Sequence, residues 1–165
     1  MKSLPKSMLE PPSQSDIRAS LIKYAAFCLN RRPYFRETLR QKLVLRSKKL
    51  NFEDVTGVIS AILVDLKKSG YLDDPYLAQA FARRQLDKGY GPRIISLKLR
   101  RMKLDQSVID QAMEEADIKK QLESIKKYAK KYEKLDKYKL THRLYARGFS
   151  SSAINKLFDV ESFED

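Results

Sequence analysis

Two stretches of this chain carry the same apolar pattern at a constant offset. When residues 95–113 are placed over residues 140–158, a shift of 45 positions, large apolar side chains coincide along the whole overlap. The coinciding pairs are Ile95 with Leu140, Leu99 with Leu144, Leu104 with Phe149, Ile109 with Ile154, and Met113 with Phe158. A recurrence of this length is typical of tandem repeats, in which neighbouring units bury a shared core. The offset therefore predicts stacked copies of one small unit.

The apolar residues follow the spacing of α-helices. The clearest stripe lies between Asn51 and Gly70, where apolar residues fall at i, i+3, i+4, i+7, i+8 and i+11. These residues are Val55, Val58, Ile59, Ile62, Leu63 and Leu66. The stripe predicts a helix with Asn51 as its N-cap, Asp54 in its first turn and Gly70 after its end. Few segments alternate with a period of two, and the hairpin dipeptides Asn-Gly and Asp-Gly are absent from the sequence, so we predict an all-α fold.

The first third of the chain contains a looser copy of the same unit. Phe35 and Leu39 precede their counterparts in residues 95–113 by 60 positions, and the offset falls to about 50 in the helix that follows. In the two closer copies Asp105 coincides with Ser150, and we expect both to cap a helix. We therefore predict three tandem three-helix repeats. The predicted segments are a flexible leader at 1–15, repeats at 16–73, 74–117 and 118–160, and an acidic tail at 161–165.

Composition excludes several classes of function. The only cysteine, Cys28, rules out an internal disulfide framework and a cysteine-rich zinc site, and the only histidine, His142, leaves little for histidine-based metal or acid–base chemistry. No apolar run approaches the roughly 18 residues of a membrane span, and residues 1–15 lack the apolar core of a secretory signal. We expect a cytoplasmic protein with no metal site and no membrane contact, and the composition disfavours much familiar catalysis. Cys28 should be buried, and His142 should face solvent or cap a helix.

The positive charge is unevenly distributed. The chain carries 34 Lys and Arg against 21 Asp and Glu, a net charge of +13, and half of the basic residues fall in segments 31–49, 93–103 and 137–147. These segments contain a single acidic residue, Glu37, and correspond to the middle helices of the repeats. Stacking of the repeats would join them into a basic stripe, which suits a phosphate backbone or an acidic protein groove. The candidate binding residues are Arg31, Arg36, Arg40, Arg93, Lys98, Arg100, Arg101, Lys103, Lys139, Arg143 and Arg147.

Two blocks of the sequence resemble a known family. The first runs Gly70-Tyr71-Leu72-Asp73-Asp74, then Ala80-Phe81, Arg83-Arg84, Gly89-Tyr90-Gly91-Pro92-Arg93-Ile94 and Leu99. The second runs Leu144-Tyr145-Ala146-Arg147-Gly148-Phe149, followed by Ile154. They resemble the RecX family of recombinase regulators, and the resemblance extends over about residues 16–160. Lys103 stands where the family usually has a glycine, the counterpart of Gly148, so we expect a less sharply turned helix end there.

The resemblance implies three tandem three-helix repeats in an elongated, curved molecule. It implies a regulator without catalytic residues or a cofactor that binds the RecA–DNA filament. Such a regulator modulates, most often inhibits, recombinase ATPase and strand exchange in DNA repair, recombination and the SOS response. The implied partners are RecA and single- and double-stranded DNA, contacted mainly at phosphates without sequence specificity, and we expect a monomer. Whether this chain blocks filament extension, destabilises filaments or stimulates the recombinase stays open.

Two other classes of function are alternatives. A stand-alone DNA-binding protein of helix-turn-helix type also contains three-helix units, and it would bind duplex DNA selectively without a recombinase. An enzyme acting on nucleic acid is disfavoured, because the sequence offers no metal-ligand or nucleophile–base constellation. Tyr71, Tyr90 and Tyr145 lie near basic residues, where they could pack at repeat junctions or stack on exposed bases.

Two proline-containing segments predict helix boundaries. In the segment 89–92, a C-terminal glycine precedes a helix that starts at Pro92. In Asp73-Asp74-Pro75, one of the two aspartates is the expected cap of a helix with Pro75 in its first turn.

Overall fold

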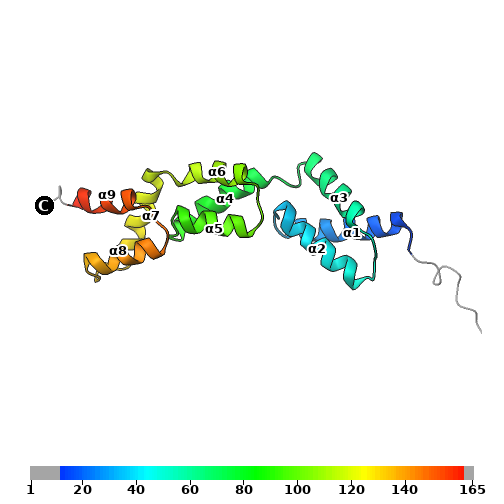
Figure 1. The fold of residues 1–165 in the computed structure, drawn as a ribbon, viewed down its shortest axis with the longest axis horizontal. Coiled ribbons are helices and arrows are strands. Elements are labelled where there is room, and N and C mark those ends of the chain that lie inside the picture. The colour runs from blue at the N-terminus through cyan, green and yellow to red at the C-terminus, as the bar shows by residue number, and fades with distance from the viewer. Residues whose placement is uncertain (1–11, 162–165) are drawn as a thin grey trace, which may run out of the picture. The chain divides into compact units, whose positions relative to one another are not determined.

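The computed structural model describes residues 12–161, and the secondary structure within that range is helical throughout (Figure 1). The all-α prediction is confirmed. The chain divides into two compact units, with the boundary between Asp73 and Asp74. Residues 1–11 of the predicted leader and residues 162–165 of the predicted acidic tail lie outside the described residues.

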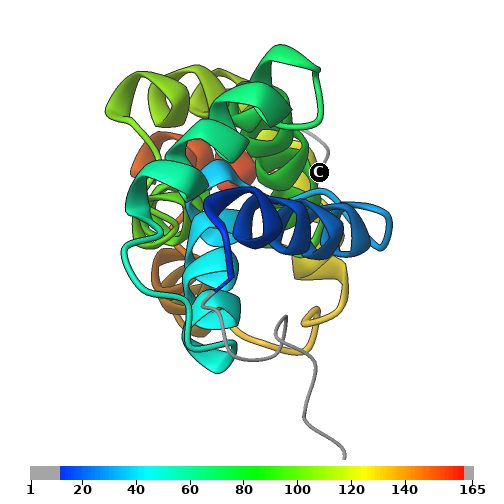
Figure 2. The same ribbon diagram turned by 90° about the vertical axis from the view of Figure 1, so that its right-hand side faces the viewer.

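The first unit is a three-helix bundle. It contains α1 (Gln14–Leu29), α2 (Arg36–Lys49) and α3 (Thr56–Lys68), each packed against the other two. Figure 2 shows α1, in dark blue, crossing α2, in cyan. At the start of α1, Ser13 Oγ accepts a hydrogen bond from the backbone N–H of Asp16 at 3.2 Å, and Asp16 accepts one from Ser13 in return. The helix therefore begins inside the segment predicted as a leader.

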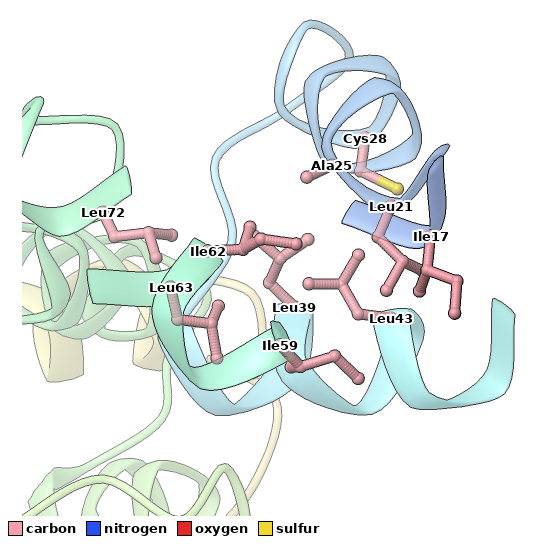
Figure 3. Packing of buried hydrophobic residues seen from close by; sticks show 10 residues of the cluster. All are labelled: Ile17, Leu21, Ala25, Cys28, Leu39, Leu43, Ile59, Ile62, Leu63 and Leu72. Atoms are coloured by element: carbon pink, nitrogen blue, oxygen red, sulfur yellow. The ribbon is translucent and has the colours of Figure 1, made fainter. Parts of the chain in front are cut away.

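One face of each helix supplies the core of the first unit (Figure 3). The buried residues of α1 and α2 recur at intervals of three or four, so that each helix presents a stripe to the other two. The buried residues of this core are Ile17, Leu21, Ala25, Cys28, Leu39, Leu43, Ile59, Ile62, Leu63 and Leu72. Cys28 is 4% exposed, which confirms the prediction of a buried thiol.

The start of α3 differs from the sequence prediction. Asn51 does not cap this helix: it has a φ of 52° in the loop after α2, and Asp54 has a φ of 46°. The helix starts at Thr56, and its N-cap residue Val55 makes no side-chain capping hydrogen bond. Asn and Asp are favoured both as caps and in left-handed turns, and here they serve the turn. Gly70, with a φ of 75°, follows the helix as predicted.

The second unit contains six α-helices joined as two successive three-helix groups. The first group is α4 (Asp74–Asp87), α5 (Pro92–Arg101) and α6 (Gln106–Met113), which ends in a 3-10 turn, η2 (Glu114–Ala116). The second group is α7 (Ile118–Lys130), α8 (Lys137–Ala146) and α9 (Ser151–Glu161). Helix α4 packs against α5 and α6, α7 packs against α9, and the two groups meet where α4 contacts α7.

The apolar register that links the two groups is confirmed in their burial. Leu99 and Leu144 are both fully buried, and Ile109 and Ile154 are each 1% exposed. Equivalent positions therefore occupy equivalent places in the two three-helix cores. The same side chains at the same helical spacing produce the same packing.

The helix ends of the two groups agree with the prediction at Ser150 and differ from it at Lys103 and Asp105. Lys103 has a φ of 58°, close to the left-handed turn that Gly148 makes with a φ of 85°, so the missing glycine does not open the turn. Ser150 Oγ accepts a hydrogen bond from the N–H of Ala153 at 3.3 Å and so caps α9. Asp105 occupies the N-cap position of α6 but makes no side-chain capping hydrogen bond.

The predicted boundaries at the two prolines are confirmed. Helix α4 starts at Asp74 with Pro75 as its second residue. Gly89, with a φ of 74°, follows α4, and α5 starts at Pro92 with Gly91 as its N-cap.

Candidate functional site

The candidate binding residues lie mainly on the surface, but their surroundings differ. Nine of the eleven are exposed, and Lys98 and Arg147 are half-buried. Some are paired within their own helix, some contact aromatic rings, and some project into solvent without a partner among residues 12–161. These three groups have different capacities for binding an anion.

Within the first unit, the cations of α2 are partly neutralised or shielded. Arg40 donates two hydrogen bonds to Glu37, from Nε at 2.6 Å and from Nη2 at 2.8 Å, and this pairing raises the pKa of Arg40. Gln41 donates a third bond to the same carboxylate at 3.1 Å. Arg40 is therefore held by its own helix, and an external anion would have to displace Glu37.

Aromatic rings hold other cations of the first unit. The guanidinium of Arg31 lies 5.3 Å from the centre of the Phe27 ring, and that of Arg32 lies 4.7 Å from the centre of Tyr34. The guanidinium of Arg46 lies 5.4 Å from Tyr24, which joins α2 to α1. Burial of Tyr24 raises the pKa of its phenol. These contacts fall within the range of cation–π attraction.

In the second unit the backbone itself joins the two three-helix groups. The N–H of Gly91 donates to the carbonyl of Arg147 at 2.9 Å, and the N–H of Arg93 donates to the carbonyl of Gly148 at 3.1 Å. A Cβ at position 91 would overlap the backbone of Gly148 and the amide nitrogen of Phe149. A Cβ at position 148 would lie 2.7 Å from a side-chain carbon of Ile94. Glycine at both positions therefore permits the close approach.

Three cations and three tyrosines line this junction. Lys98 Nζ and the Arg147 guanidinium lie 3.6 and 4.7 Å from the centre of the Tyr90 ring. The same guanidinium lies 4.7 Å from Tyr128, whose ring centre is 4.8 Å from that of Tyr132. Arg143 completes the series at 4.6 Å from Tyr132. We call these six side chains the cation–aromatic ladder. It joins α5 and the loop before it to α7, α8 and the residues that follow α7 and α8.

Hydrogen bonds fix two of the cations of the ladder. Arg147 Nη1 donates to the carbonyl of Lys88 at 3.2 Å, and Lys98 Nζ donates to Gln85 Oε1 at 2.6 Å. Burial alone would raise the pKa of the Tyr128 phenol, but its hydrogen bond with Tyr132 and the charge of Arg147 lower that pKa below its ordinary value. Arg147 thus packs between the two repeats, while Lys98 and Arg143 contact rings of their own three-helix groups.

Buried polar side chains bridge the same two groups. Gln121 donates to the carbonyl of Ala116 at 2.9 Å and accepts from the backbone N–H and the hydroxyl of Ser150 at 3.2 and 2.9 Å. The hydroxyl of Ser124 donates to the carbonyl of Leu86 on α4. Both side chains are buried, and each has hydrogen-bond partners.

A third group of cations projects from the C-terminal end of α5. Arg100, Arg101 and Lys103 are exposed, and none of their side chains makes a hydrogen bond, ion pair or ring contact within residues 12–161. Their charges are not neutralised by a neighbouring carboxylate. They are therefore the part of the predicted basic stripe best able to meet an external anion.

The remaining candidates lie near the starts of α8, α5 and α2. Lys139 pairs with Asp136 at 3.1 Å, and the pKa of Asp136 is lowered, first by the hydrogen bond it accepts from the Lys139 backbone N–H. Arg93 Nη2 donates to the carbonyl of Tyr145 at 3.2 Å, and Arg36 is exposed at the first residue of α2. The structure thus brings Arg93 close to Tyr145.

The structure also locates residues that the sequence did not single out. Tyr128 lies on α7 and Tyr132 in the turn that follows it; both belong to the ladder, and their spacing of i and i+4 is the only sequence signal for their contact. Tyr90 packs at the repeat junction, which is the first of the two roles predicted for it. Tyr71 and Tyr145 are 65% and 42% exposed, and His142 also faces solvent.

No metal site is evident in the described part of the chain. Within residues 12–161, no cluster of three or more His, Cys, Asp or Glu side chains is placed to hold a metal ion. Over the same range, no helix has both the length and the apolarity that crossing a membrane requires.

Comparison with known proteins gives consistent matches. Residues 73–113 match the family model described as RecX, second three-helix domain. The regulatory protein RecX of Thermotoga sp. strain RQ2 is 34% identical over 143 residues, which cover 84% of this chain and 82% of the relative. The regulatory protein RecX of Thermus thermophilus is 30% identical over 128 residues, which cover 78% of this chain and 82% of the relative.

Solved structures share the fold. The crystal structure of RecX from Lactobacillus salivarius superposes with a TM-score of 0.76 at 21% sequence identity, and the match covers 90% of this chain and 99% of that one. Another crystal structure, of regulatory protein RecX, gives a TM-score of 0.74 at 22% identity and covers 96% and 79%. The tandem arrangement of three-helix repeats agrees with these structures. The relatives are regulatory proteins, and this chain is a regulator, not an enzyme.

Proposed function

Since the chain belongs to the RecX family of regulatory proteins, we propose that it binds the RecA recombinase on DNA and lowers the recombinase's ATPase and strand-exchange activities. It acts as a monomer in the cytoplasm, where this filament forms. It contacts single- and double-stranded DNA mainly at phosphates. No cofactor enters the proposal, because regulation by binding needs only a difference in affinity between states of the filament.

The observation that supports this function is the group of unpaired cations at the end of α5. The side chains of Arg100 and Arg101 are exposed and make no hydrogen bond or ion pair within residues 12–161. A guanidinium presents a planar fork of donors that matches a phosphate or a carboxylate at two points. A filament of DNA and protein presents such groups at regular intervals, so a chain of repeats can engage several at once.

Linkage of the repeats strengthens this binding. Once one basic segment has bound, the next is held at a high effective concentration near the neighbouring site. A regulator that bridges neighbouring recombinase subunits would restrain the movements that accompany ATP hydrolysis and strand exchange. The proposed inhibition follows from this restraint.

The direct test is the DNA-dependent ATPase of the host recombinase, titrated with the full chain. We expect hydrolysis and strand exchange to fall to a plateau as the chain saturates the filament. Unchanged hydrolysis, strand exchange and filament lifetime at saturation would contradict the proposal, and a rise in hydrolysis would reverse the sign of regulation.

A charge-reversal pair tests the α5 surface. The double variant Arg100→Glu with Arg101→Glu should weaken binding to the filament by an order of magnitude or more, because each reversal removes an attraction and adds a repulsion. The matched control is Lys126→Glu with Lys130→Glu, which reverses the same number of exposed charges on α7. If both double variants bind equally, net charge explains the loss and the α5 surface is not the contact.

A titration of the chain with duplex DNA, without recombinase, separates this function from that of a stand-alone helix-turn-helix protein. Such a protein would bind duplex DNA with sequence preference in the absence of recombinase. For the regulator we expect binding to duplexes of different sequence to be equal at one salt concentration, and to weaken together as salt is raised.

A further inference from the structure

Three aromatic rings line the solvent side of α8. Tyr138, His142 and Tyr145 follow one another at i, i+4 and i+7, on the face opposite the buried Leu140 and Leu144. Tyr138 is 75% exposed and Tyr145 is 42% exposed. The ring centres of Tyr138 and His142 lie 5.6 Å apart. We call the three rings the α8 aromatic face.

This face differs from the tyrosines of the ladder. The rings of Tyr90, Tyr128 and Tyr132 are half-buried or buried, and each has a cation from the protein itself over it. No cation is recorded over the rings of Tyr138 or Tyr145 among the described residues. Large exposed aromatic side chains without an intramolecular role are typical of binding surfaces.

A cavity adjoins one end of the aromatic face. Its volume is about 740 Å³, and His142 and Tyr145 form part of its wall. Arg93 lines the same cavity, together with Ser150 and Ser151 at the start of α9. The cavity therefore combines two of the rings with a guanidinium and with the positive end of a helix.

The charges around the face are positive. Segment 137–147 contains Lys137, Lys139, Arg143 and Arg147 and no acidic residue, and the adjacent carboxylate of Asp136 pairs with Lys139. A ligand of the face must therefore combine flat apolar surfaces with negative charge. Unpaired nucleic-acid bases on a phosphate backbone have both properties, whereas the bases of a duplex are already stacked on each other and present only their edges.

The spacing of the rings also favours an unpaired strand. Residues three and four apart on a helix are separated by about 4.5 and 6 Å along its axis, because each residue rises about 1.5 Å. Stacked bases of a duplex strand are separated by about 3.4 Å. Consecutive bases could reach successive rings only on a strand extended beyond the duplex spacing.

We propose that the α8 aromatic face is a binding site for single-stranded nucleic acid, with unpaired bases stacked on Tyr138, His142 and Tyr145 and a phosphate in the cavity beside Arg93. This inference deepens the proposed function, since it assigns one part of the chain to the unpaired strand, and it rests on that function. The site reads no sequence, because every base has a flat face to stack.

The test measures binding of the full chain, without recombinase, to a fluorescent oligothymidylate by anisotropy. Tyr138→Ala and Tyr145→Ala should each weaken this binding roughly five- to 150-fold. Tyr138→Phe should bind as the unchanged chain does, because stacking needs the ring and not the hydroxyl. The matched control is Tyr71→Ala, which removes an exposed ring of similar accessibility from the first unit.

A second probe separates bases from phosphates. An abasic strand of equal length retains the phosphates and lacks the bases, so its affinity should be weaker and should be the same for the unchanged chain and both alanine variants. Equal oligothymidylate binding by the unchanged chain, Tyr138→Ala and Tyr145→Ala would overturn the inference. An equal loss of affinity for the abasic strand in those variants would overturn it too, because bases would then play no part.

The stacking site and the proposed function can be rejected separately. If the chain inhibits the recombinase ATPase and the alanine variants bind oligothymidylate normally, the regulator stands and the stacking site is wrong. If the variants lose base-dependent binding and the ATPase does not respond to the chain, the site stands and the regulatory function is wrong. Circular dichroism of each variant should match that of the unchanged chain, since both rings are exposed.

Discussion

The two compact units use their basic side chains in different ways. In the first unit, arginines pair locally, as Arg40 does with Glu37 and Arg32 does with Tyr34, while an apolar core from three helices holds the bundle. In the second unit, Arg147 inserts its guanidinium between Tyr90 and Tyr128 and joins two three-helix groups. Similar basic segments therefore have different roles: local pairing in one unit, and packing between repeats in the other.

This difference also separates candidates for binding from structural residues. The cations of the ladder are held by rings and carbonyl groups, whereas the side chains of Arg100 and Arg101 remain without partners in the described range. Counting basic residues by segment does not distinguish these cases. We expect the second unit to depend on its junction as strongly as the first depends on its core.

The largest expected effect is at Gly91. Gly91→Ala should lower the free energy of unfolding by at least about 3 kcal/mol, because its Cβ would overlap the backbone of Gly148 across the junction. Urea denaturation followed by circular dichroism measures the loss. The control is Gly57→Ala on α3 of the first unit, where a Cβ would meet nothing within 4 Å, and it should be neutral or stabilising by up to about 1 kcal/mol. Equal stability of the two variants would show that the junction can move to accommodate a Cβ at position 91 without loss of stability.

The next effect concerns the buried amide of Gln121. Gln121→Met should cost about 1–3 kcal/mol, because the backbone N–H and hydroxyl of Ser150 lose their acceptor in a buried site. Gln41→Met makes the same substitution on the surface of the first unit and should change stability by less than about 0.5 kcal/mol. The same denaturation experiment compares them, and a smaller cost at position 121 than at position 41 would contradict the comparison.

Removal of the central cation of the ladder should have an intermediate effect. Arg147→Met removes one guanidinium from two rings and should cost about 1–2 kcal/mol, whereas Arg32→Met removes a single exposed ring contact in the first unit and should cost about 0.5 kcal/mol. Chemical denaturation at neutral pH measures both. Equal costs would mean that the ladder adds nothing beyond an ordinary surface contact.

The same variant has a spectroscopic signature. The charge of Arg147 contributes to the lowered pKa of Tyr128, so Arg147→Met should shift one tyrosine titration to higher pH in the ultraviolet absorbance. A phenol whose folded pKa is lowered stabilises the protein above the unfolded pKa of about 10, and that contribution is lost as pH falls through the folded value. Arg147→Met should therefore lose part of this gain at high pH. If no tyrosine titration shifts, the charge of Arg147 does not lower the pKa of Tyr128.

The smallest expected effect is at the cap of α8. The pKa of Asp136 is lowered by the backbone N–H of Lys139, so ionised Asp136 stabilises the fold above its unfolded pKa of about 4, and the stabilisation is lost as pH falls through the lower folded value. Asp136→Asn retains an acceptor but cannot ionise, so its melting temperature should fall less steeply than that of the unchanged chain as the pH is lowered from about 5 to about 2. If the melting temperatures of the two proteins fall in parallel over that range, the ionised Asp136 does not stabilise the fold.

Much of the fold could be predicted because it depends on local spacing. Ile109 and Ile154 are buried at equivalent positions, as the offset of their segments predicted. The first residue of α3 could not be predicted from the sequence, because Asn51 suits a cap and a left-handed turn equally well. At Lys103, the missing glycine predicted an open turn, yet the backbone accepts the left-handed conformation there.

The amino-acid sequence by itself determined the helices, their buried faces, the repeat and the family, because a helix buries residues three and four apart and that spacing is written along the chain. Only the tertiary structure decided which cations remain available. Arg147 reaches the carbonyl of Lys88, 59 positions earlier, and Tyr90 lies between cations from two repeats. Such contacts depend on how two repeats meet, since the distance between side chains from different helices follows from packing and not from spacing along one helix.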